Sequence, residues 1–137
     1  MVKISLGGDI QCKGVQTAAM RRKYGGLRFD EYLGAIAPLL RDSDYVIANL
    51  ETPVCPSQPL NESGVRFNAP VELLDAIKAA GINFVSTANN HCLDCGAEGV
   101  RETIHALDAA GLQHAGTYLS PQDADQIFTS QLSTLQT

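Results

Sequence analysis

Short apolar runs alternate along the chain with stretches whose apolar residues recur every three or four positions. The runs at 3–7, 45–50, 83–87 and 112–115 have the length of buried strands. Helical spacing is found at 30–41, between Pro70 and Gly81, and at 97–110, which Gly111 ends. A strand, helix, strand order of this kind predicts an α/β fold whose mainly parallel sheet is flanked by helices.

The connecting segments differ in character. Residues 9–28 form a glycine-containing polar connection with a short helical stretch at 15–22, and Pro38 predicts a kink or a restart in the helix at 30–41. Residues 52–70 contain four prolines and predict a long loop of the kind that is usually functional in a compact domain. A further helix is expected at 121–128. The uncharged residues 129–137 predict a frayed tail, so we expect one domain over 1–128 followed by that tail.

Composition narrows the range of partners. The 137 residues carry a formal net charge of −5, which leaves no basic surface large enough to indicate nucleic acid. A local basic cluster, defined by Arg21, Arg22, Lys23 and Arg28, is interpreted as a solvated loop in preference to a clamp for an anionic substrate.

The N-terminal residues lead directly into the first expected strand. They lack the long apolar core of a signal peptide, and no apolar run approaches the roughly 20 residues that a membrane span requires. We therefore expect a cytoplasmic chain with no membrane span. Its four cysteines are then expected to be mainly reduced thiols.

Polar side chains follow three of the expected strands at the point where each strand ends. Asp9 follows the first strand, Glu51 the second, and His91 and Asp94 the third. Ligands bind at the carboxyl ends of the strands in open α/β sheets, so these side chains are expected to gather there. Carboxylate oxygens and imidazole nitrogens bind divalent metals, and Asp9 is the best candidate for a metal carboxylate.

An ordered set of short motifs resembles one known family, the bacterial capsule synthesis CapA family. The resemblance extends from residue 3 to about residue 124 and rests on these runs: Gly8-Asp9-Ile10, Ala48-Asn49-Leu50-Glu51-Thr52-Pro53, Phe67-Asn68-Ala69-Pro70, Ala88-Asn89-Asn90-His91-Cys92-Leu93-Asp94-Cys95-Gly96 and Gly116. The family is associated with poly-gamma-glutamate capsule biosynthesis and has a calcineurin-like metallophosphoesterase fold. The resemblance therefore implies a metal-dependent hydrolase site.

The resemblance also implies roles for individual residues. The bridging aspartate of metallophosphoesterases aligns most simply with Asn49, but bridging two cations favours an anion, so Glu51 is the preferred ligand. Asn90 and His91 resemble the Asn-His pair in which the asparagine oxygen binds metal and the histidine lies beside the leaving group. His91 would then act as a general acid or stabilise transition-state charge, with Asp94 holding its imidazole in position. The expected cofactor is a divalent metal: Mn, Mg, Fe or Zn.

The second half of a metallophosphoesterase supplies further histidine ligands from Gly-His and His-x-His motifs. Neither motif occurs here. The remaining histidines do not match those positions either, since His105 falls in an expected helix and His114 in an expected strand. We therefore expect the first half of the fold, truncated and with impaired activity, that acts on an anionic polymer or a phosphoester. The alternative is a non-catalytic half-fold that binds a partner or self-associates through an uncovered sheet face.

The cysteines leave further alternatives open. Cys92 and Cys95 have Cys-x-x-Cys spacing, while Cys12 and Cys55 follow strands at the same expected sheet edge, so a four-thiol zinc cluster or a redox role is conceivable. In the family these two positions are commonly apolar or aromatic, so the pair is interpreted as incidental. The sequence contains no G-x-G-x-x-G or P-loop pattern, and a nucleotide cofactor is not supported.

Overall fold

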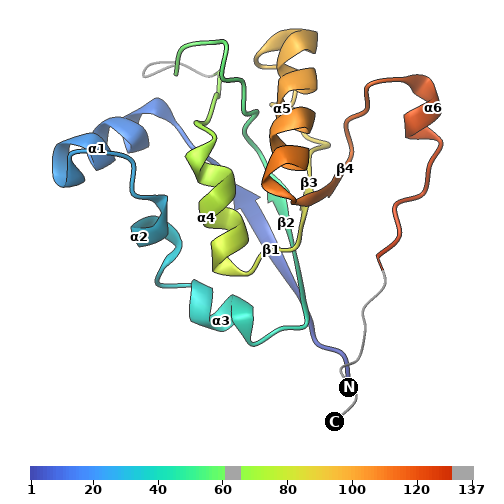
Figure 1. Ribbon diagram of the computed structural model, residues 1–137, viewed down its shortest axis with the longest axis horizontal. Coiled ribbons are helices and arrows are strands. Elements are labelled where there is room, and N and C mark those ends of the chain that lie inside the picture. Colours follow the sequence, from blue (N-terminus) through green and yellow to red (C-terminus); the bar gives the residue numbers. More distant parts are fainter. Residues whose placement is uncertain (61–65, 131–137) are drawn as a thin grey trace.

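The computed structural model describes residues 1–60 and 66–130, and it has an α/β architecture (Figure 1). The four strands are β1 (Ile4–Ile10), β2 (Tyr45–Leu50), β3 (Phe84–Ser86) and β4 (Gln113–Ala115). The helices are α1 (Gly14–Tyr24), α2 (Phe29–Leu33), α3 (Ala37–Arg41), α4 (Glu72–Ala80), α5 (Gly96–Ala110) and α6 (Pro121–Ala124). The expected strand, helix, strand order is confirmed.

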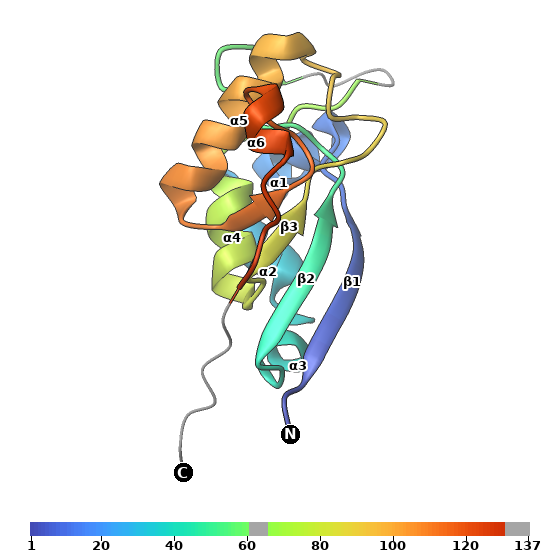
Figure 2. The ribbon, with the colours of Figure 1, turned by 90° about the vertical axis from the view of Figure 1, so that its right-hand side faces the viewer.

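All neighbouring strands pair in parallel, in the order β1-β2-β3-β4. Because each strand is placed beside its predecessor without a reversal, right-handed crossovers carry the connecting helices over the same face. Figure 2 shows α4 and α5 on one side of the sheet, whereas the opposite side of β1 and β2 carries no helix of the described residues. The described sheet is thus covered by helices on one face only.

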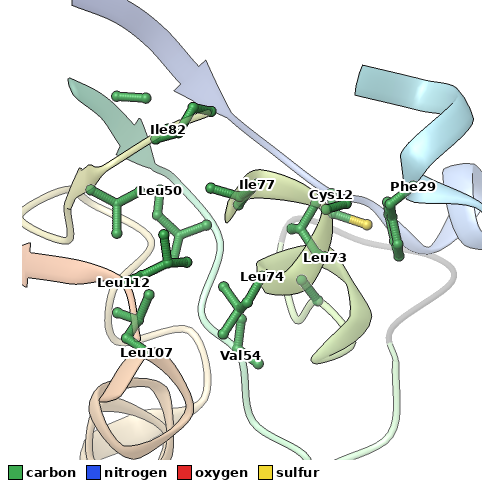
Figure 3. Close-up of a cluster of buried hydrophobic side chains, with 14 of the residues drawn as sticks. Cys12, Phe29, Leu50, Val54, Leu73, Leu74, Ile77, Ile82, Leu107 and Leu112 are labelled. Atoms are coloured by element: carbon green, nitrogen blue, oxygen red, sulfur yellow. The ribbon is translucent and has the colours of Figure 1, made fainter. Parts of the chain in front are cut away.

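The hydrophobic core lies between this covered face and α4. Leu74 and Ile77 of α4 are fully buried against apolar side chains of the sheet, and Leu107 of α5 closes the core from the side (Figure 3). Helix α4 also contacts α2, α3 and α5. Its apolar positions therefore tie the three connections to one another as well as to the sheet.

The opposite face is largely open. Ile4 and Leu6 of β1 are 53% and 78% exposed, although both are large apolar residues in a strand. Farther along the sheet, Phe128 covers Phe84 of β3, with ring centroids 4.8 Å apart. Exposed apolar surface therefore remains mainly over β1.

The expected helix at 30–41 is two short helices. The break lies between Leu33 and Ala37, before Pro38, and Pro38 occupies the first turn of α3. A proline is tolerated there because the N–H that it lacks has no partner within the helix. The expected restart is therefore confirmed, with the boundary shifted towards the N-terminus.

The basic cluster is not a loop over most of its length. Helix α1 continues to Tyr24, so Arg21, Arg22 and Lys23 form its last turn, where positive charge is favourable beside the helix C-terminus. Arg28 pairs with Asp30 at 2.8 Å and with Glu31 at 2.9 Å.

Near the C-terminus, the helix expected at 121–128 is only the four-residue α6. The chain leaves helical structure after this point, and the Phe128 ring packs on β3. Most of the tail expected at 129–137 lies outside the described residues, as do residues 61–65 of the long loop. None of the helices in the described ranges is long and apolar enough to cross a membrane.

Replacing Leu74 with alanine should destabilise the fold by about 2–5 kcal/mol, because it leaves a cavity at the centre of the core. Leu39→Ala on α3 is the matched control: Leu39 is 74% exposed, and its truncation should change stability by less than about 0.5 kcal/mol. Urea unfolding followed by circular dichroism measures both values. Equal losses for the two variants would contradict this placement of the core.

Candidate functional site

A one-residue register shift in β1 places the first candidate ligand. Leu6 pairs with Ile47, but Asp9 rather than Gly8 pairs with Asn49, so β1 contains one extra residue around Gly7 and Gly8. Such a bulge reverses the face to which the following side chains point. The strand expected to end at residue 7 therefore continues to Ile10 and presents Asp9 beside Asn49. The Asn49 Nδ2 donates a hydrogen bond to Asp9 Oδ1 at 2.8 Å.

A chain of amides links the ends of β2 and β3. Asn89 Nδ2 donates to Asn49 Oδ1 at 3.1 Å and to the Leu50 carbonyl at 2.9 Å, and Asn89 Oδ1 accepts from the His91 backbone N–H at 3.0 Å. Asn89 therefore fixes the start of the His91 loop against β2. Asn90, the residue expected to bind metal, is exposed, and its side chain makes no hydrogen bond to this network within the described ranges.

Two carboxyl groups share a hydrogen bond next to this amide chain. Hydrogen bonds from Asn49 and from Glu51 lower the pKa of Asp9, whereas the hydrogen bond to Asp9 and partial burial raise the pKa of Glu51. These opposite directions make Asp9 the stronger acid of the pair and Glu51 the weaker one. The hydrogen bond between the two carboxyl groups thus makes Glu51 harder to ionise.

His91 faces this carboxyl pair from the third strand end. Its Nδ1 lies 2.8 Å from Asp94 Oδ2, its Nε2 lies 3.9 Å from Glu51 Oε1, and the Phe67 ring stacks on the imidazole with centroids 4.0 Å apart. The side chains of Glu51, His91 and Asp94 are only 15–17% exposed. The carboxylate of Asp94 favours a proton on Nδ1. The other ring nitrogen, Nε2, faces Glu51.

The long loop takes part in holding this arrangement. The Phe67 backbone N–H donates to Asp94 Oδ2 at 2.6 Å, so Asp94 accepts from both the loop and His91. Asn68 is buried, and its side chain both accepts from the Cys55 N–H at 2.9 Å and donates to the Cys55 carbonyl at 3.0 Å. Sequence reasoning gave no role to Asn89, Phe67 or Asn68, although all three lie in the motifs that carried the resemblance.

The structure therefore brings Asp9, Asn49, Glu51, His91 and Asp94 together and leaves Asn90 apart. Carboxylate and amide oxygens are the donors that a hard divalent cation prefers. The hydrogen bond with Asp9 and partial burial, which raise the pKa of Glu51, both oppose the ionised form that would bind a cation. In their present positions, no group of three or more His, Cys, Asp or Glu side chains among residues 1–60 and 66–130 is arranged to hold a metal ion. The donor chemistry fits a cation, and cation binding would compete with protonation of Glu51, whose pKa is raised.

An apolar cavity of about 250 Å³ adjoins the cluster beneath β1. Asp9 and Gln11 lie at its polar end, and Met20, Phe29 and Leu33 are among its apolar walls. Glu51 and His91 do not line it. The polar cluster is therefore a surface feature at the strand ends and is not enclosed by this cavity.

A family comparison matches this set of residues in their order along the chain. The family described as bacterial capsule synthesis protein PGA_cap matches residues 3–136. The chain belongs to this family. The match includes every residue of the cluster, from Asp9 to Asp94.

Individual relatives match the chain over a small part of their own length. The chain is 31% identical over 128 residues to the capsule biosynthesis protein CapA of Bacillus anthracis, which covers 90% of this chain and 30% of that protein. It is 27% identical over 97 residues to the PGA biosynthesis protein CapA of Bacillus subtilis, covering 69% of this chain and 26% of that protein. An uncharacterized protein of Sinorhizobium fredii, y4sH, is 39% identical over 87 residues, or 59% of this chain and 19% of its own length.

The chain therefore spans less than a third of the length of each of these three relatives. The two Bacillus proteins are named as biosynthesis proteins. The expected family is confirmed for this chain.

The carboxyl pair makes stability depend on pH. Because the pKa of Glu51 is raised above its ordinary 4.5 in the folded chain, folding is penalised as pH rises from 4.5 through the raised value. Glu51→Gln keeps a neutral donor to Asp9 and should raise the unfolding temperature at pH 7 by a few degrees. This advantage should vanish below pH 4.5, where Glu51 is protonated in both states.

Thermal unfolding from pH 3 to 8 measures the effect of Glu51→Gln. Glu98→Gln is the matched control: Glu98 forms an exposed ion pair with Arg101, at 3.2 Å, and should change the curve little at any pH. A Glu51→Gln variant that is destabilised at pH 7 would show that the pKa of Glu51 is not raised in the folded chain.

Proposed function

We propose that this capsule synthesis family member carries part of a metal-dependent, metallophosphoesterase-type hydrolytic site used in capsule polymer biosynthesis. The observation behind this proposal is the convergence of Asp9, Glu51 and His91 from three different strand ends. Three sequence-distant polar groups meeting at the carboxyl edge of a parallel sheet are typical of a functional site.

The carboxyl pair is the proposed place for the cation. Asp9 and Glu51 would supply anionic oxygens and Asn49 an amide oxygen, while Asn90 would have to turn inwards to contribute. A bound divalent cation would polarise a phosphoryl oxygen and lower the pKa of a bound water. Because Glu51 must lose its proton for this, cation binding should strengthen as pH rises.

His91 is the proposed general acid. Asp94 and the Phe67 ring hold its imidazole on two sides, so the ring needs little reorganisation to deliver a proton from Nε2 to a leaving oxygen. Lys13 lies near this position, with its Nζ 5.1 Å from the Phe67 ring centroid, and adds positive charge beside the carboxylates. An anionic substrate, either a phosphoester or an anionic polymer such as poly-gamma-glutamate, suits this environment.

The 137 residues contain neither a Gly-His nor a His-x-His motif. We therefore propose that the ligands in these residues are those at the strand ends alone, and that a site made of them is weakly active. The weakness follows from the small number of ligands, since a cation held by few donors is bound less tightly.

A second candidate function is non-catalytic association through the open sheet face. The exposed apolar side chains of Ile4 and Leu6 on β1 favour it, because a contiguous apolar strand surface tends to recruit a partner. In that case the chain would pair with a partner or with a second copy of itself.

Cation binding tests the first candidate. Calorimetric titration with Mn²⁺ or Mg²⁺ should show binding that Asp9→Asn weakens by about tenfold or more, while Asp75→Asn on the exposed face of α4 leaves it unchanged. Hydrolysis of bis(p-nitrophenyl) phosphate should require the cation, and His91→Asn should lower the rate without lowering cation affinity. Absence of cation binding by the unaltered chain would overturn the proposed site.

Sedimentation velocity tests the second candidate. The unaltered chain should self-associate with rising concentration, and Leu6→Lys should restore a monomer because it places a charge on the open face. Leu39→Lys, which replaces an equally exposed leucine on α3, should leave the association intact. A chain that stays monomeric at all concentrations would exclude self-association.

A further inference from the structure

Two of the four cysteines meet behind the His91 loop, and the proposed hydrolytic site does not use them. Cys55 belongs to the segment that follows β2, and Cys95 directly precedes α5. Both side chains are buried, and the Cys55 thiol lies near enough to Cys95 to contribute to the raised pKa of Cys95. They are separated by 40 positions in the sequence and do not belong to the same Cys-x-x-Cys motif.

Gly99 of α5 makes this contact possible. A Cβ atom at position 99 would lie 3.7 Å from the Cys95 sulfur and 3.8 Å from the Cys55 sulfur, and only 2.2 Å from the Cys95 Cβ. The two sulfurs therefore face the same small space beside a residue without a side chain. A side chain at this position would clash with the Cys95 Cβ and force Cys95 to shift.

The backbones of both cysteines are already held in place. Asn68 bonds the N–H and the carbonyl of Cys55, and Gln58 Nε2 donates to the Cys95 carbonyl at 3.0 Å. The neighbouring Val54 N–H donates to Thr103 Oγ1 of α5 at 2.9 Å, which docks the same segment on the helix. The backbones on both sides of the thiol pair are therefore docked by hydrogen bonds before any bond between the sulfurs forms.

The thiols of Cys12 and Cys92 lie in two other cavities, away from this pair. Cys92 is partly exposed and lines a small cavity with Val100 and Thr117, whereas the Cys95 thiol donates to the Phe67 carbonyl at 3.6 Å. Cys12 lines the apolar cavity beneath β1. The Cys-x-x-Cys spacing of Cys92 and Cys95 is therefore a less suitable pair than Cys55 and Cys95.

We propose that Cys55 and Cys95 are an oxidation site at which a disulfide joins the segment after β2 to the start of α5. The oxidant is a low-molecular-weight disulfide such as oxidised glutathione. Each thiol gives up its proton and the pair gives up two electrons, so that one S–S bond forms, the S–S bond of the oxidant breaks and two molecules of reduced thiol leave.

Because both thiols are buried in the folded chain, the disulfide should form more readily during folding than after it. Burial chiefly, and then the Cys55 thiol, raises the pKa of Cys95 to about 12, so very little thiolate is present in the folded chain at neutral pH. Oxidation of the folded protein is accordingly slow. Once formed, the bond is shielded from reductants by the same burial, and it fixes the segment that carries Glu51 relative to the loop that carries His91.

The test refolds the full chain in a buffer of reduced and oxidised glutathione. Thiol titration in denaturant should find two of the four thiols consumed, and peptide mapping should link Cys55 to Cys95. The unfolding temperature should rise by on the order of 10 °C relative to the reduced chain. Cys12→Ser and Cys92→Ser should both keep the linked peptide and the temperature rise.

Cys55→Ser should lose both the linked peptide and the temperature rise. Four free thiols after refolding, or a link between Cys92 and Cys95, would overturn the proposal. If Cys55→Ser fails to fold, the peptide map of the Cys92→Ser chain still decides, because it retains the proposed pair and lacks the competing partner. None of these readouts involves hydrolysis or cation binding, so the result is independent of the proposed function.

Discussion

Burial of the apolar side of α4 is the interaction on which the other elements depend. Leu74 and Ile77 exclude water from the covered face of the sheet, and the same helix contacts α2, α3 and α5. Because the strands follow one another without a reversal, the connections are gathered on one face, and a single central helix is enough to organise them. The opposite face contributes little to this core, which explains how Leu6 can remain exposed in a strand.

The polar cluster depends on a smaller feature of the sheet, the extra residue in β1. In an unbroken parallel register Gly8 would lie opposite Asn49 and the side chain of Asp9 would point to the other face. With the bulge, Asp9 meets Asn49, and the amide chain through Asn89 extends the contact to the His91 loop. A local irregularity thus converts three separate strand ends into one continuous network.

Much of this arrangement could be predicted from the residue pattern, and the failures have physical causes. The four strands, α4 and α5 follow from strong periodicity and from glycines at helix ends, and the gathering of Asp9, Glu51 and His91 follows from parallel strand direction. The bulge could not be predicted, because a glycine pair permits a turn as readily as an irregular strand. The hydrogen-bond network of Asn89 could not be predicted, since two adjacent amides differ only in which one the loop turns inwards. The helix expected at 121–128 was cut short by tertiary packing of Phe128, which local propensity does not register.

The side chain of Asn68 imitates a neighbouring strand, because it accepts from the N–H and donates to the carbonyl of the same residue, Cys55. These two hydrogen bonds close the base of the long loop. One end of the loop leads back to Glu51, and the other leads to Phe67, which contacts Asp94. Because one side chain supplies both hydrogen bonds, the positions of Cys55 and Phe67 are coupled through Asn68. A single amide therefore sets the width of the loop base from which the Glu51 side and the Phe67 side both extend.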